Sequence, residues 1–509
     1  MTLVIGIDSS TQSTKAELRN IATGELVATG KASHPPTQPP VSEQDPQAWW
    51  EALVSAVQQL GERRSEAVAL SVAGQQHGLA LVDEAGKSLR PAKLWNDTTS
   101  APNADHLVEK LGADYWSSAT GSVPVAAFTV TKLAYVAEHE PDVIDRVAKV
   151  MLPHDYLTWR LSGEHVTDRG DASGTGWFDA ATDLYLTEPI AAALGSGAFS
   201  SGGDWTARLP RVLGPLEAAG TIDPTVAADL GLSASTLIGP GTGDNMGAAL
   251  GLGLGVGDVV LSLGTSGTVY AKSNTRTTDP SGAVAGFADA SGAFLPLVCT
   301  LNATKVTDTV ATWLGTDAPG LAELALAAGT DAISPVLVPY FDGERTPNRP
   351  ESKGIFVGLT NETTREQLAR AAHDGVICGL LEGLSALENC GGSSDGRVLL
   401  VGGGARSAAY RQRLADISGR AVHLPKSDET VSTGAAVQAA AVYVAANSSA
   451  SNGVAGAIAK FVEIAEDWAL TSTQVTEPRA DLNTSELRDQ YRRAASFDDG
   501  LCRVPSTTQ

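Results

Sequence analysis

A single acidic residue stands in a run of small residues near the middle of the chain. The stretch 239–251 reads GPGTGDNMGAALG, and Asp244 is its only charged residue. A metal-binding loop would bring more acids, and a simple turn would not need so many glycines. Because glycines let the backbone and a bound molecule approach closely, the pattern favours an acid that acts on a ligand.

Three turns rich in glycine and hydroxyl groups each follow an apolar strand. They are DSSTQSTK at residues 8–15, GTSGT at 264–268 and GGGARS at 402–407. Exposed backbone N–H groups and hydroxyls in such turns form concave anion sites. One such turn alone is more simply a tight hairpin, but three of them at strand ends favour phosphate binding.

Two acids near these turns suggest a metal site and a proton acceptor. Asp8 ends the first strand and faces the first turn, where a carboxylate can hold hydrated Mg²⁺ against phosphate oxygens. The alternative for Asp8 is an Asx-turn. Asp244 precedes the second turn and would repel a polyphosphate unless a cation or a proton-bearing substrate came between them. A general base acting on a sugar hydroxyl meets that condition.

Neutral polar groups of the kind that bind a polyol follow other strands. GQQHG at residues 74–78 supplies Gln76 and His77, and LWNDT at 94–98 supplies Trp95 and Asn96. A structural histidine and a core tryptophan are the simpler alternatives. The histidines show no HExxH or HxH spacing and the cysteines no CxxC, which disfavours a zinc-type site.

Alternating strands and helices must position these residues. Helix is predicted to begin near residues 45–46 and to cover 408–418 and 432–446, between strands at 3–8, 15–20, 26–32, 67–73, 258–263, 268–272, 397–401 and 421–424. Such alternation is typical of an α/β fold with mixed sheets. VIGIDSSTQSTK and VVLSLGTSGTVY share a strand, a hydroxyl-rich turn and a returning strand, so we expect two lobes of related design.

Length, charge and cysteine content limit the class of protein. A chain of 509 residues is too long for one ordinary core. With 36 basic and 58 acidic residues, its formal charge of −22 argues against nucleic-acid and anionic membrane partners. Four scattered cysteines suit a reducing compartment, and neither a signal peptide nor a membrane-spanning run is expected. The expected location is cytoplasmic.

These motifs, taken in order, resemble those of the FGGY carbohydrate kinase family, and within it the xylulokinase group. The resemblance rests on IGIDSSTQSTK, VSEQDPQAWW, GQQHG, LWND, LPHDY, GTGDN, LSLGTSG, PYFDGERTP, GGGARS and RQRLADISG. It implies two actin-like lobes of the ribonuclease H type, with ATP and sugar in the cleft between them. The implied domains are an N-terminal lobe at 1–250, a C-terminal lobe at 251–446 and a polar, partly helical tail at 447–509.

The resemblance also implies a role for each candidate residue. Asp244 matches the family's catalytic base, and Asp8 matches the acid near Mg²⁺, which it would hold directly or through water. The implied sugar-binding residues are Gln76, His77, Trp95, Asn96 and Asp244. The implied nucleotide-binding residues are Thr11, Gln12, Gly264, Thr265 and Ser266 in the phosphate loops, and Gly403, Gly404 and Ala405 in the adenosine loop.

The implied reaction is ATP-dependent phosphorylation of the 5-hydroxyl of D-xylulose, and the implied assembly, by analogy alone, is a homodimer. Kinases for ribulose, fuculose or gluconate are the nearest alternatives. An actin-like ATPase or a catalytically idle sugar-binding regulator would leave GQQHG and LWND, or the two acids, without a role. The chain departs from the family at residues 98–100, where an Arg is usual, at Gln76, where Met is common, and at Thr242, where Gly is usual. These departures bear on sugar specificity.

Overall fold

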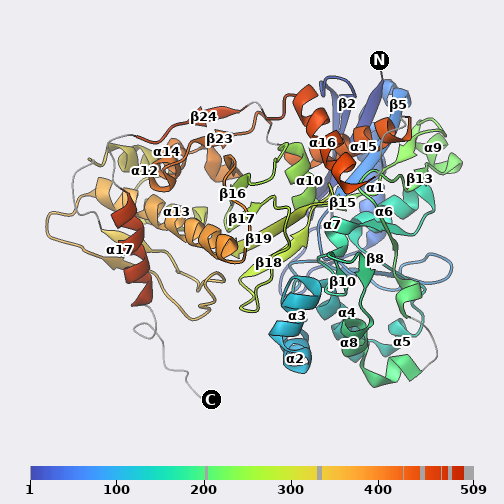
Figure 1. Cartoon of the computed structure of the whole chain (residues 1–509), viewed down its shortest axis with the longest axis horizontal. Coiled ribbons are helices and arrows are strands. Elements are labelled where there is room, and N and C mark those ends of the chain that lie inside the picture. Colours follow the sequence, from blue (N-terminus) through green and yellow to red (C-terminus); the bar gives the residue numbers. More distant parts are fainter. Residues whose placement is uncertain are drawn as a thin grey trace. The chain divides into compact units, whose positions relative to one another are not determined.

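The structure is a computed structural model that describes residues 2–200, 205–329, 335–427, 429–447, 453–471, 473–479 and 484–497. Its contacts divide the chain into two compact units (Figure 1). The first unit comprises Met1–Gly255, Ser273–Leu295 and Glu429–Thr471, and the second comprises Val256–Lys272, Pro296–Asp428 and Ser472–Gln509.

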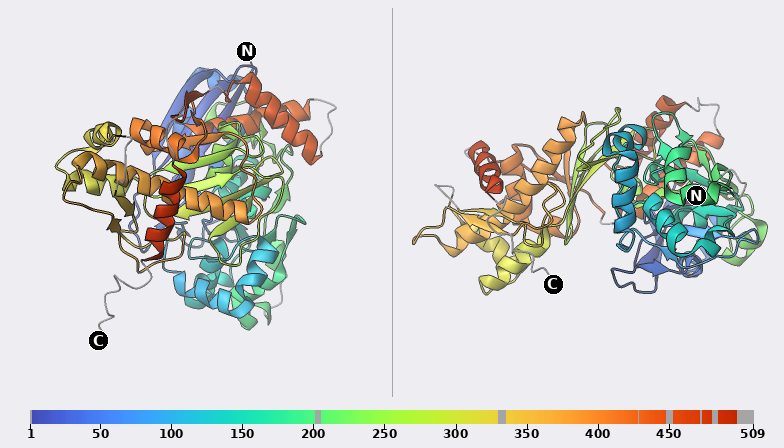
Figure 2. Two further views of the ribbon diagram at one scale, coloured as in Figure 1. Left: turned by 60° about the vertical axis from the view of Figure 1, so that its left-hand side comes forward. Right: turned by 90° about the horizontal axis from the view of Figure 1, so that it is seen from below.

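The first unit is built on a seven-stranded sheet, with strands in the order β13–β14–β5–β1–β2–β3 and β15 also paired to β5. The strands are β1 (Leu3–Ser9), β2 (Ser13–Asn20), β3 (Leu26–Ser33), β5 (Ala67–Gly74), β13 (Gly220–Thr221), β14 (Leu237–Ile238) and β15 (Thr242–Gly243). β1 is antiparallel to β2 and parallel to β5. Every residue of β1 is buried, as expected for a strand covered on both faces. The blue strands β1–β3 lie side by side in Figure 2.

Helices bury the apolar faces of this sheet. Helix α1 (Pro46–Gln58) begins as the sequence predicts, because the Asp45 carboxylate accepts a hydrogen bond from the Gln47 N–H and Pro46 occupies the first turn. Its Trp49 and Leu53 are buried in the core on the sheet. The helices that matter for the site are α6 (Pro153–Ser162), α7 (Arg169–Ala172), α10 (Asp244–Gly251) and α15 (Thr430–Ala446).

The second sheet repeats the pattern of the first. It has seven strands in the order β18–β19–β17–β16–β22–β23–β24. The strands are β16 (Val259–Leu263), β17 (Gly267–Ala271), β18 (Val284–Ala288), β19 (Phe294–Thr300), β22 (Val398–Val401), β23 (Val422–Leu424) and β24 (Gln474–Thr476). β16 is antiparallel to β17 and parallel to β22, as β1 is to β2 and β5. The predicted α/β class with mixed sheets is confirmed.

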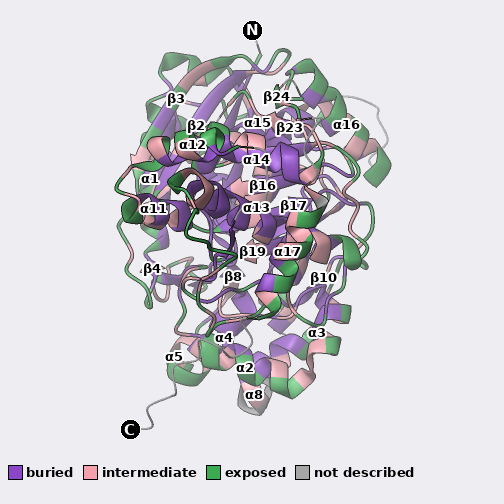
Figure 3. Ribbon diagram, turned by 90° about the vertical axis from the view of Figure 1, so that its left-hand side faces the viewer, coloured by how far each residue is buried: buried purple, intermediate pink, exposed green. Residues whose placement is uncertain are grey.

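Helices also cover the strands of the second unit. The longest is α13 (Arg365–Asn389), which begins with a capping box between Thr364 and Gln367. Helix α14 covers Ala408–Ser418, the range that the sequence predicts. The sheet strands and the inner faces of these helices are drawn largely as buried in Figure 3.

The last part of the chain contributes helices and one strand. Helix α16 (Val454–Asp467) contacts α15, β24 pairs with β23, and α17 (Ser485–Ser496) contacts α13. Of the predicted linker at 447–453, residues 448–452 lie outside the described part of the chain. None of the helices in the described ranges is both long and apolar enough to span a bilayer.

Candidate active site

The topology of the first sheet brings the predicted acids to one edge. β1 and β15 both run parallel to β5, and Asp8 on one side and Thr242 on the other pair with Ala73. Because neighbouring strands lie about 4.8 Å apart, the Cα atoms of Asp8 and Thr242 are about 10 Å apart. Gln76 follows the carboxyl end of β5, and Asp244 follows β15. Three residues from distant parts of the chain thus meet at the carboxyl ends of three parallel strands.

Asp244 is the first residue of α10 and is half-buried. Its Oδ1 accepts a hydrogen bond from the Asn245 N–H at 2.8 Å. Burial raises the pKa of Asp244 to about 6, against the opposing effect of that hydrogen bond. A carboxylate with this pKa is ionised at neutral pH yet basic enough to accept a proton, as a general base requires.

Asp8 is 5% exposed at the end of β1. The Lys15 ammonium lies 4.0 Å from its Oδ2 and 2.5 Å from Glu429 Oε2. Burial raises the pKa of Asp8 to about 7, opposed by Lys15 and reinforced by the charge of Asp244. The other carboxylate oxygen, Oδ1, is buried without a hydrogen-bond partner. A buried polar atom of this kind is suited to a partner such as an ordered water or an ion.

The residues fit a magnesium ion that is shared with a substrate. Among the described residues, no group of three or more His, Cys, Asp or Glu is arranged to hold a metal by itself. Mg²⁺, however, usually keeps several waters and binds through one or two carboxylates plus substrate phosphates. Asp8, with its unpartnered Oδ1, supplies such a carboxylate.

Gln76 and His77 both lie at the end of β5, but their surroundings differ. Gln76 is buried, and its Oε1 accepts a hydrogen bond from Asn245 Nδ2 at 2.6 Å. This contact ties the predicted sugar-binding residue to the neighbour of Asp244. His77 has a positive φ of 63°, and its ring stacks on Phe128 with centroids 5.0 Å apart. Its Nδ1 lies 2.9 Å from the Gly174 carbonyl oxygen, which fixes the ring orientation.

The residues around Trp95 connect the LWND segment to the first phosphate turn. Trp95 is 48% exposed, and its indole N–H donates to Thr11 Oγ1 at 2.9 Å. Thr11 in turn donates to Gln75 Oε1 at 3.0 Å. Asn96 has a buried Oδ1 without a hydrogen-bond partner, whereas Gln12 is exposed. The exposed indole of Trp95 is accessible to a ligand, whereas the Asn96 amide oxygen is shielded from solvent.

The other two predicted loops lie together in the second unit. The loop between β16 and β17 exposes Thr265 and Ser266, and its Gly264 carbonyl accepts hydrogen bonds from the Thr304 N–H at 3.0 Å and hydroxyl at 2.9 Å. The short helix η3 (Gly403–Arg406) follows the parallel neighbour β22. Both loops therefore sit at the carboxyl ends of adjacent parallel strands.

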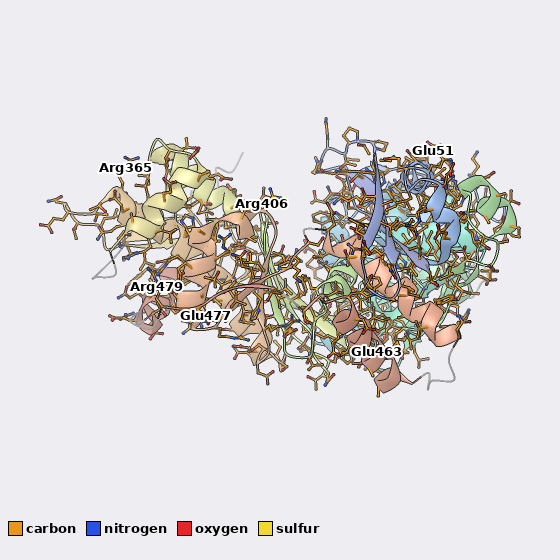
Figure 4. All side chains as sticks on the ribbon, turned by 90° about the horizontal axis from the view of Figure 1, so that it is seen from above. Glu51, Arg365, Arg406, Glu463, Glu477 and Arg479 are labelled. Atoms are coloured by element: carbon orange, nitrogen blue, oxygen red, sulfur yellow. The ribbon has the colours of Figure 1, made fainter. Side chains whose placement is uncertain are left out.

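Close backbone contact explains the glycines of the second loop. A Cβ on Gly402 would lie 2.6 Å from the Leu263 carbonyl oxygen, and one on Gly404 would lie 2.7 Å from Leu263 Cβ. Gly403 faces open space, and Arg406, labelled in Figure 4, is exposed. The backbone at Gly403 is therefore open, with no heavy atom within 4 Å of a Cβ built there.

Sequence reasoning did not identify several residues that contact the predicted site. Asn245 could have been found, because it directly follows Asp244 in the sequence. Phe128 and Phe287, whose rings lie 5.0 and 5.6 Å from that of His77, carry no local signal. Asp171, which accepts from Gln76 Nε2 at 3.4 Å, lies outside every motif used.

Comparison with known proteins identifies the family. The chain matches the N-terminal domain of the FGGY family of carbohydrate kinases over residues 3–251 and its C-terminal domain over residues 259–443. It is 49% identical to the xylulose kinase of Streptomyces rubiginosus over 443 residues, which cover 86% of this chain and 87% of that one. The xylulose kinase of Escherichia coli (strain K12) is 37% identical over 426 residues, 82% of this chain and 85% of that one. The crystal structure of xylulose kinase from Bifidobacterium adolescentis is similar with a TM-score of 0.85 at 40% identity, covering 97% of this chain and 99% of that one. The chain therefore belongs to the FGGY family of carbohydrate kinases.

Proposed function

We propose that this carbohydrate kinase is a xylulose kinase, which transfers the γ-phosphoryl group of ATP to the 5-hydroxyl of D-xylulose with Asp244 as the general base. Relatives named xylulose kinase share up to 49% of its residues over most of the chain. The observation that supports the role of Asp244 is its half-buried carboxylate, which follows strand β15 beside the carboxyl end of β5. Burial raises the pKa of this carboxylate to about 6. Gln76 and Asn245, joined at 2.6 Å, lie beside it.

In this proposal the first unit binds the sugar and moves its proton. Gln76, His77, Trp95 and Asn96 bind the sugar hydroxyls and cover its apolar face. The 5-hydroxyl gives its proton to Asp244 as its oxygen bonds to the γ-phosphorus, and the bond from that phosphorus to the β-phosphate oxygen breaks to leave ADP. The proposal asks the aligned carboxylate to contribute about 10²- to 10⁴-fold of the rate.

The second unit and Asp8 supply charge stabilisation. We place the phosphates of ATP on Thr11 and Gln12 in the first turn and on Gly264, Thr265 and Ser266 in the second, with the adenosine on Gly403, Gly404 and Ala405. Backbone N–H groups and hydroxyls fixed in such turns stabilise the charge of the transferring phosphoryl group without reorganising. Mg²⁺, when held by Asp8 directly or through water, would neutralise charge on the phosphates.

A coupled assay of ADP release tests the substrate. We expect D-xylulose to give the highest kcat/KM in a panel with D-ribulose, L-fuculose and D-gluconate. A higher kcat/KM for another member of the panel would show that the protein is a sugar kinase whose preferred substrate is that sugar. Absence of turnover with every sugar would refute the proposed function.

Substitution of the base tests the mechanism. Asp244→Asn keeps the size of the side chain but removes the carboxylate, and we expect kcat to fall by about 10²- to 10⁴-fold while ATP still binds. The matched control is Asp229→Asn, at an exposed residue of helix α9 (Pro224–Leu230) in the same unit, which should leave kcat unchanged. An Asp244→Asn enzyme with nearly normal kcat would contradict the assignment.

A homodimer and a cytoplasmic location are further parts of this proposal. The homodimer comes from likeness to the family, and the location comes from the four scattered cysteines and the sequence pattern. Sedimentation equilibrium of the purified chain tests the assembly, with a mass of twice 52.4 kDa expected.

A further inference from the structure

A buried group of charged side chains lies close to the candidate base in the first unit. His154, near the start of α6, is 0% exposed, and its Nε2 lies near three carboxylate oxygens. These belong to Asp155 at 3.2 Å, Asp171 at 3.3 Å and Asp168 at 3.5 Å. In the ranges that the structure describes, none of these aspartates pairs with a lysine or arginine. His154 is therefore the basic side chain that faces all three aspartates.

The electrostatics of the group favour a protonated imidazole. Burial by itself would lower the pKa of His154, but the surrounding carboxylates, Asp155 foremost, raise it to about 9. Burial raises the pKa of Asp155 to about 6 and that of Asp171 well above its usual value, each opposed by His154. Removing one partner from such a buried group leaves an uncompensated charge, which is strongly unfavourable.

Glycines hold the imidazole ring against the segment that leads to Asp244. A Cβ on Gly241 would lie 2.4 Å from His154 Nδ1, and Gly241 has a φ of +77°. A Cβ on Gly74, at the end of β5, would lie 3.1 Å from His154 Cβ. The ring thus packs directly on the backbone three residues before the candidate base.

One path leads from His154 through Asp168, whose Oδ1 lies 3.5 Å from the His154 Nε2 as a charge contact, to the residue two positions before Asp244. The Asp168 carboxylate accepts from the Thr242 hydroxyl at 2.8 Å through Oδ2. It also caps α7, accepting from the Gly170 N–H at 2.9 Å through Oδ2 and from the Asp171 N–H at 2.9 Å through Oδ1. Asp168 is thereby fixed by three hydrogen bonds, and one of them orients the Thr242 hydroxyl.

A second path leads from His154 to the residue that follows Asp244. Asp171 Oδ1 accepts from Gln76 Nε2 at 3.4 Å. Gln76 Oε1 accepts from Asn245 Nδ2 at 2.6 Å. The amide of Gln76 is therefore oriented by a carboxylate on one side and a carboxamide on the other.

We propose that His154 is a positioning residue of the kinase: its imidazolium holds Asp168 and Asp171, which in turn hold Thr242 and Gln76 on either side of Asp244. His154 itself does not touch the sugar in this arrangement. The inference rests on the proposed function, in which Asp244 accepts the proton of the 5-hydroxyl and Gln76 binds the sugar.

Two substitutions at residue 154 separate charge from shape. His154→Gln keeps a donor of similar reach but removes the charge, and His154→Lys keeps the charge. A misplacement of reacting groups by about 1 Å costs on the order of 100-fold, so we expect kcat/KM for D-xylulose to fall about 10- to 100-fold in His154→Gln. KM for ATP should stay within about twofold, because the hydrogen bonds of Asp171 and Asp168 lead to Gln76 and Thr242, which are not assigned to ATP. His154→Lys should recover most of the loss.

The control is another histidine of the same unit. His165 is half-buried and contacts the Val150 carbonyl oxygen at 3.0 Å, outside the group. His165→Gln should leave both kinetic constants within about twofold. Unchanged sugar kinetics in His154→Gln, an equal rise of both KM values, or a His154→Lys enzyme no better than His154→Gln would each overturn the proposal. A wild-type enzyme that phosphorylates no sugar would instead refute the proposed function.

If the His154→Gln protein does not fold, Thr242→Val provides a second test of the proposal. This change replaces the hydroxyl that donates to the Asp168 carboxylate with a methyl group, and loss of a hydrogen bond to a charged group should lower kcat/KM for the sugar about 10-fold or more. An unchanged value would contradict the first path.

The protonation of His154 has a readout that does not depend on activity. The chain has eight histidines, and ¹³C labelling of their imidazole Cε1 gives separate NMR signals that the His154→Gln spectrum assigns. We expect the His154 signal to keep the imidazolium shift from pH 6 to pH 8. A neutral imidazole in that range would overturn the proposal.

Discussion

At the scale of single residues, the site is defined by two carboxylates that burial has made more basic. Asp8 has a pKa of about 7 and Asp244 a pKa of about 6, and the charge of Asp244 contributes to the shift at Asp8. Perturbed acids of this kind concentrate at functional sites.

The first prediction concerns the pH dependence of the reaction. A general base works only when it is ionised, so kcat/KM for the sugar should fall as the pH drops below about 7, through the range in which Asp8 and Asp244 take up protons. The check is a pH–rate profile from pH 5 to pH 9. A rate that stays level down to pH 5 would mean that neither acid has the raised pKa.

The second prediction concerns the cost of holding Asp8 charged in the core. Its pKa is higher in the folded chain than in the unfolded chain, so the ionised form destabilises the fold above about pH 7, and this cost disappears as the pH falls toward 4. Asp8→Asn should therefore raise the free energy of unfolding at pH 8 by up to about 4 kcal/mol and have little effect at pH 4.

Urea unfolding at the two pH values measures this difference. The same variant should lose kinase activity, since the gain in stability comes from removing a functional charge. A variant that is less stable than the wild type at pH 8 would show that the ion pair with Lys15 outweighs the burial of the charge.

At the scale of elements, α15 holds α10 by contact between their backbones. A Cβ on Gly434 would lie 1.8 Å from the Gly247 carbonyl oxygen, and one on Gly251 would lie 1.9 Å from the Thr430 carbonyl oxygen. α15 also reaches β1, where a Cβ on Gly6 would lie 2.0 Å from the Ser432 carbonyl oxygen. One helix thus fixes both the helix that begins with Asp244 and the strand that carries Asp8.

The third prediction tests this contact with Gly434→Ala. Alanine is a better helix former than glycine by about 1 kcal/mol, but the added Cβ would meet backbone atoms that cannot move away. Overpacking costs about 1–3 kcal/mol or more, so we expect a lower free energy of unfolding and a lower kcat, measured by urea unfolding and by the coupled assay.

Gly379→Ala is the matched control, in helix α13 of the second unit. There the nearest atom to an added Cβ is the Tyr491 hydroxyl at 3.3 Å, at the end of a side chain. We expect a change of less than about 1 kcal/mol in the free energy of unfolding. Equal effects of the two changes would remove the special role of the contact between α15 and α10.

At the scale of the whole molecule, the predicted sites divide between the two units. The first unit contains both acids and every residue proposed to bind the sugar, and the second contains Gly264, Thr265, Ser266 and the loop 403–405. Asp8, Gln76 and Asp244 lie at the carboxyl ends of parallel strands in the first sheet, and the loops at 264–266 and 403–405 do so in the second. Trp95 and Asn96 instead follow the short strand β7 (Ala92–Lys93), which pairs with β4 (Glu43–Gln44) outside the first sheet. The same strand pattern therefore positions predicted site residues in both sheets.

The fourth prediction follows from this division. The double change Thr265→Ala and Ser266→Ala removes exposed hydroxyls assigned to charged phosphates, and such hydrogen bonds contribute about 1.5–3 kcal/mol each. KM for ATP should rise about tenfold or more, with little change in sugar binding. Gln76→Ala should instead raise KM for D-xylulose about 3- to 10-fold.

Steady-state kinetics with each substrate varied in turn measure both effects. Thr312→Ala, at an exposed hydroxyl of helix α11 (Thr304–Trp313) in the second unit, should change neither constant. If Gln76→Ala weakened ATP binding as much as sugar binding, the division would be wrong.

Much of the fold was predictable because its signals are local. The strand at β1, the proline-initiated start of α1 and the whole of α14 follow from apolar runs, a capping aspartate and a glycine-bounded helix. The likeness between the turns after β1 and β16 correctly indicated two related sheets. Local sequence did not show that β24 joins the second sheet, since a three-residue strand has almost no pattern of its own.

The sequence by itself determined the identity of the chemical groups: the lone Asp244 among glycines, Asp8 at a strand end, and the bare loops around Thr265 and Gly403. Only the tertiary structure decided which groups meet. Asp8 and Thr242 both pair with Ala73 of β5, from its two sides. His154 lies within 3.5 Å of Asp155 in its own helix and of Asp168 and Asp171 from a later segment. Strand pairing and burial join residues far apart in the chain, and they set the pKa values and the orientation of the site, which no spacing along the sequence contains.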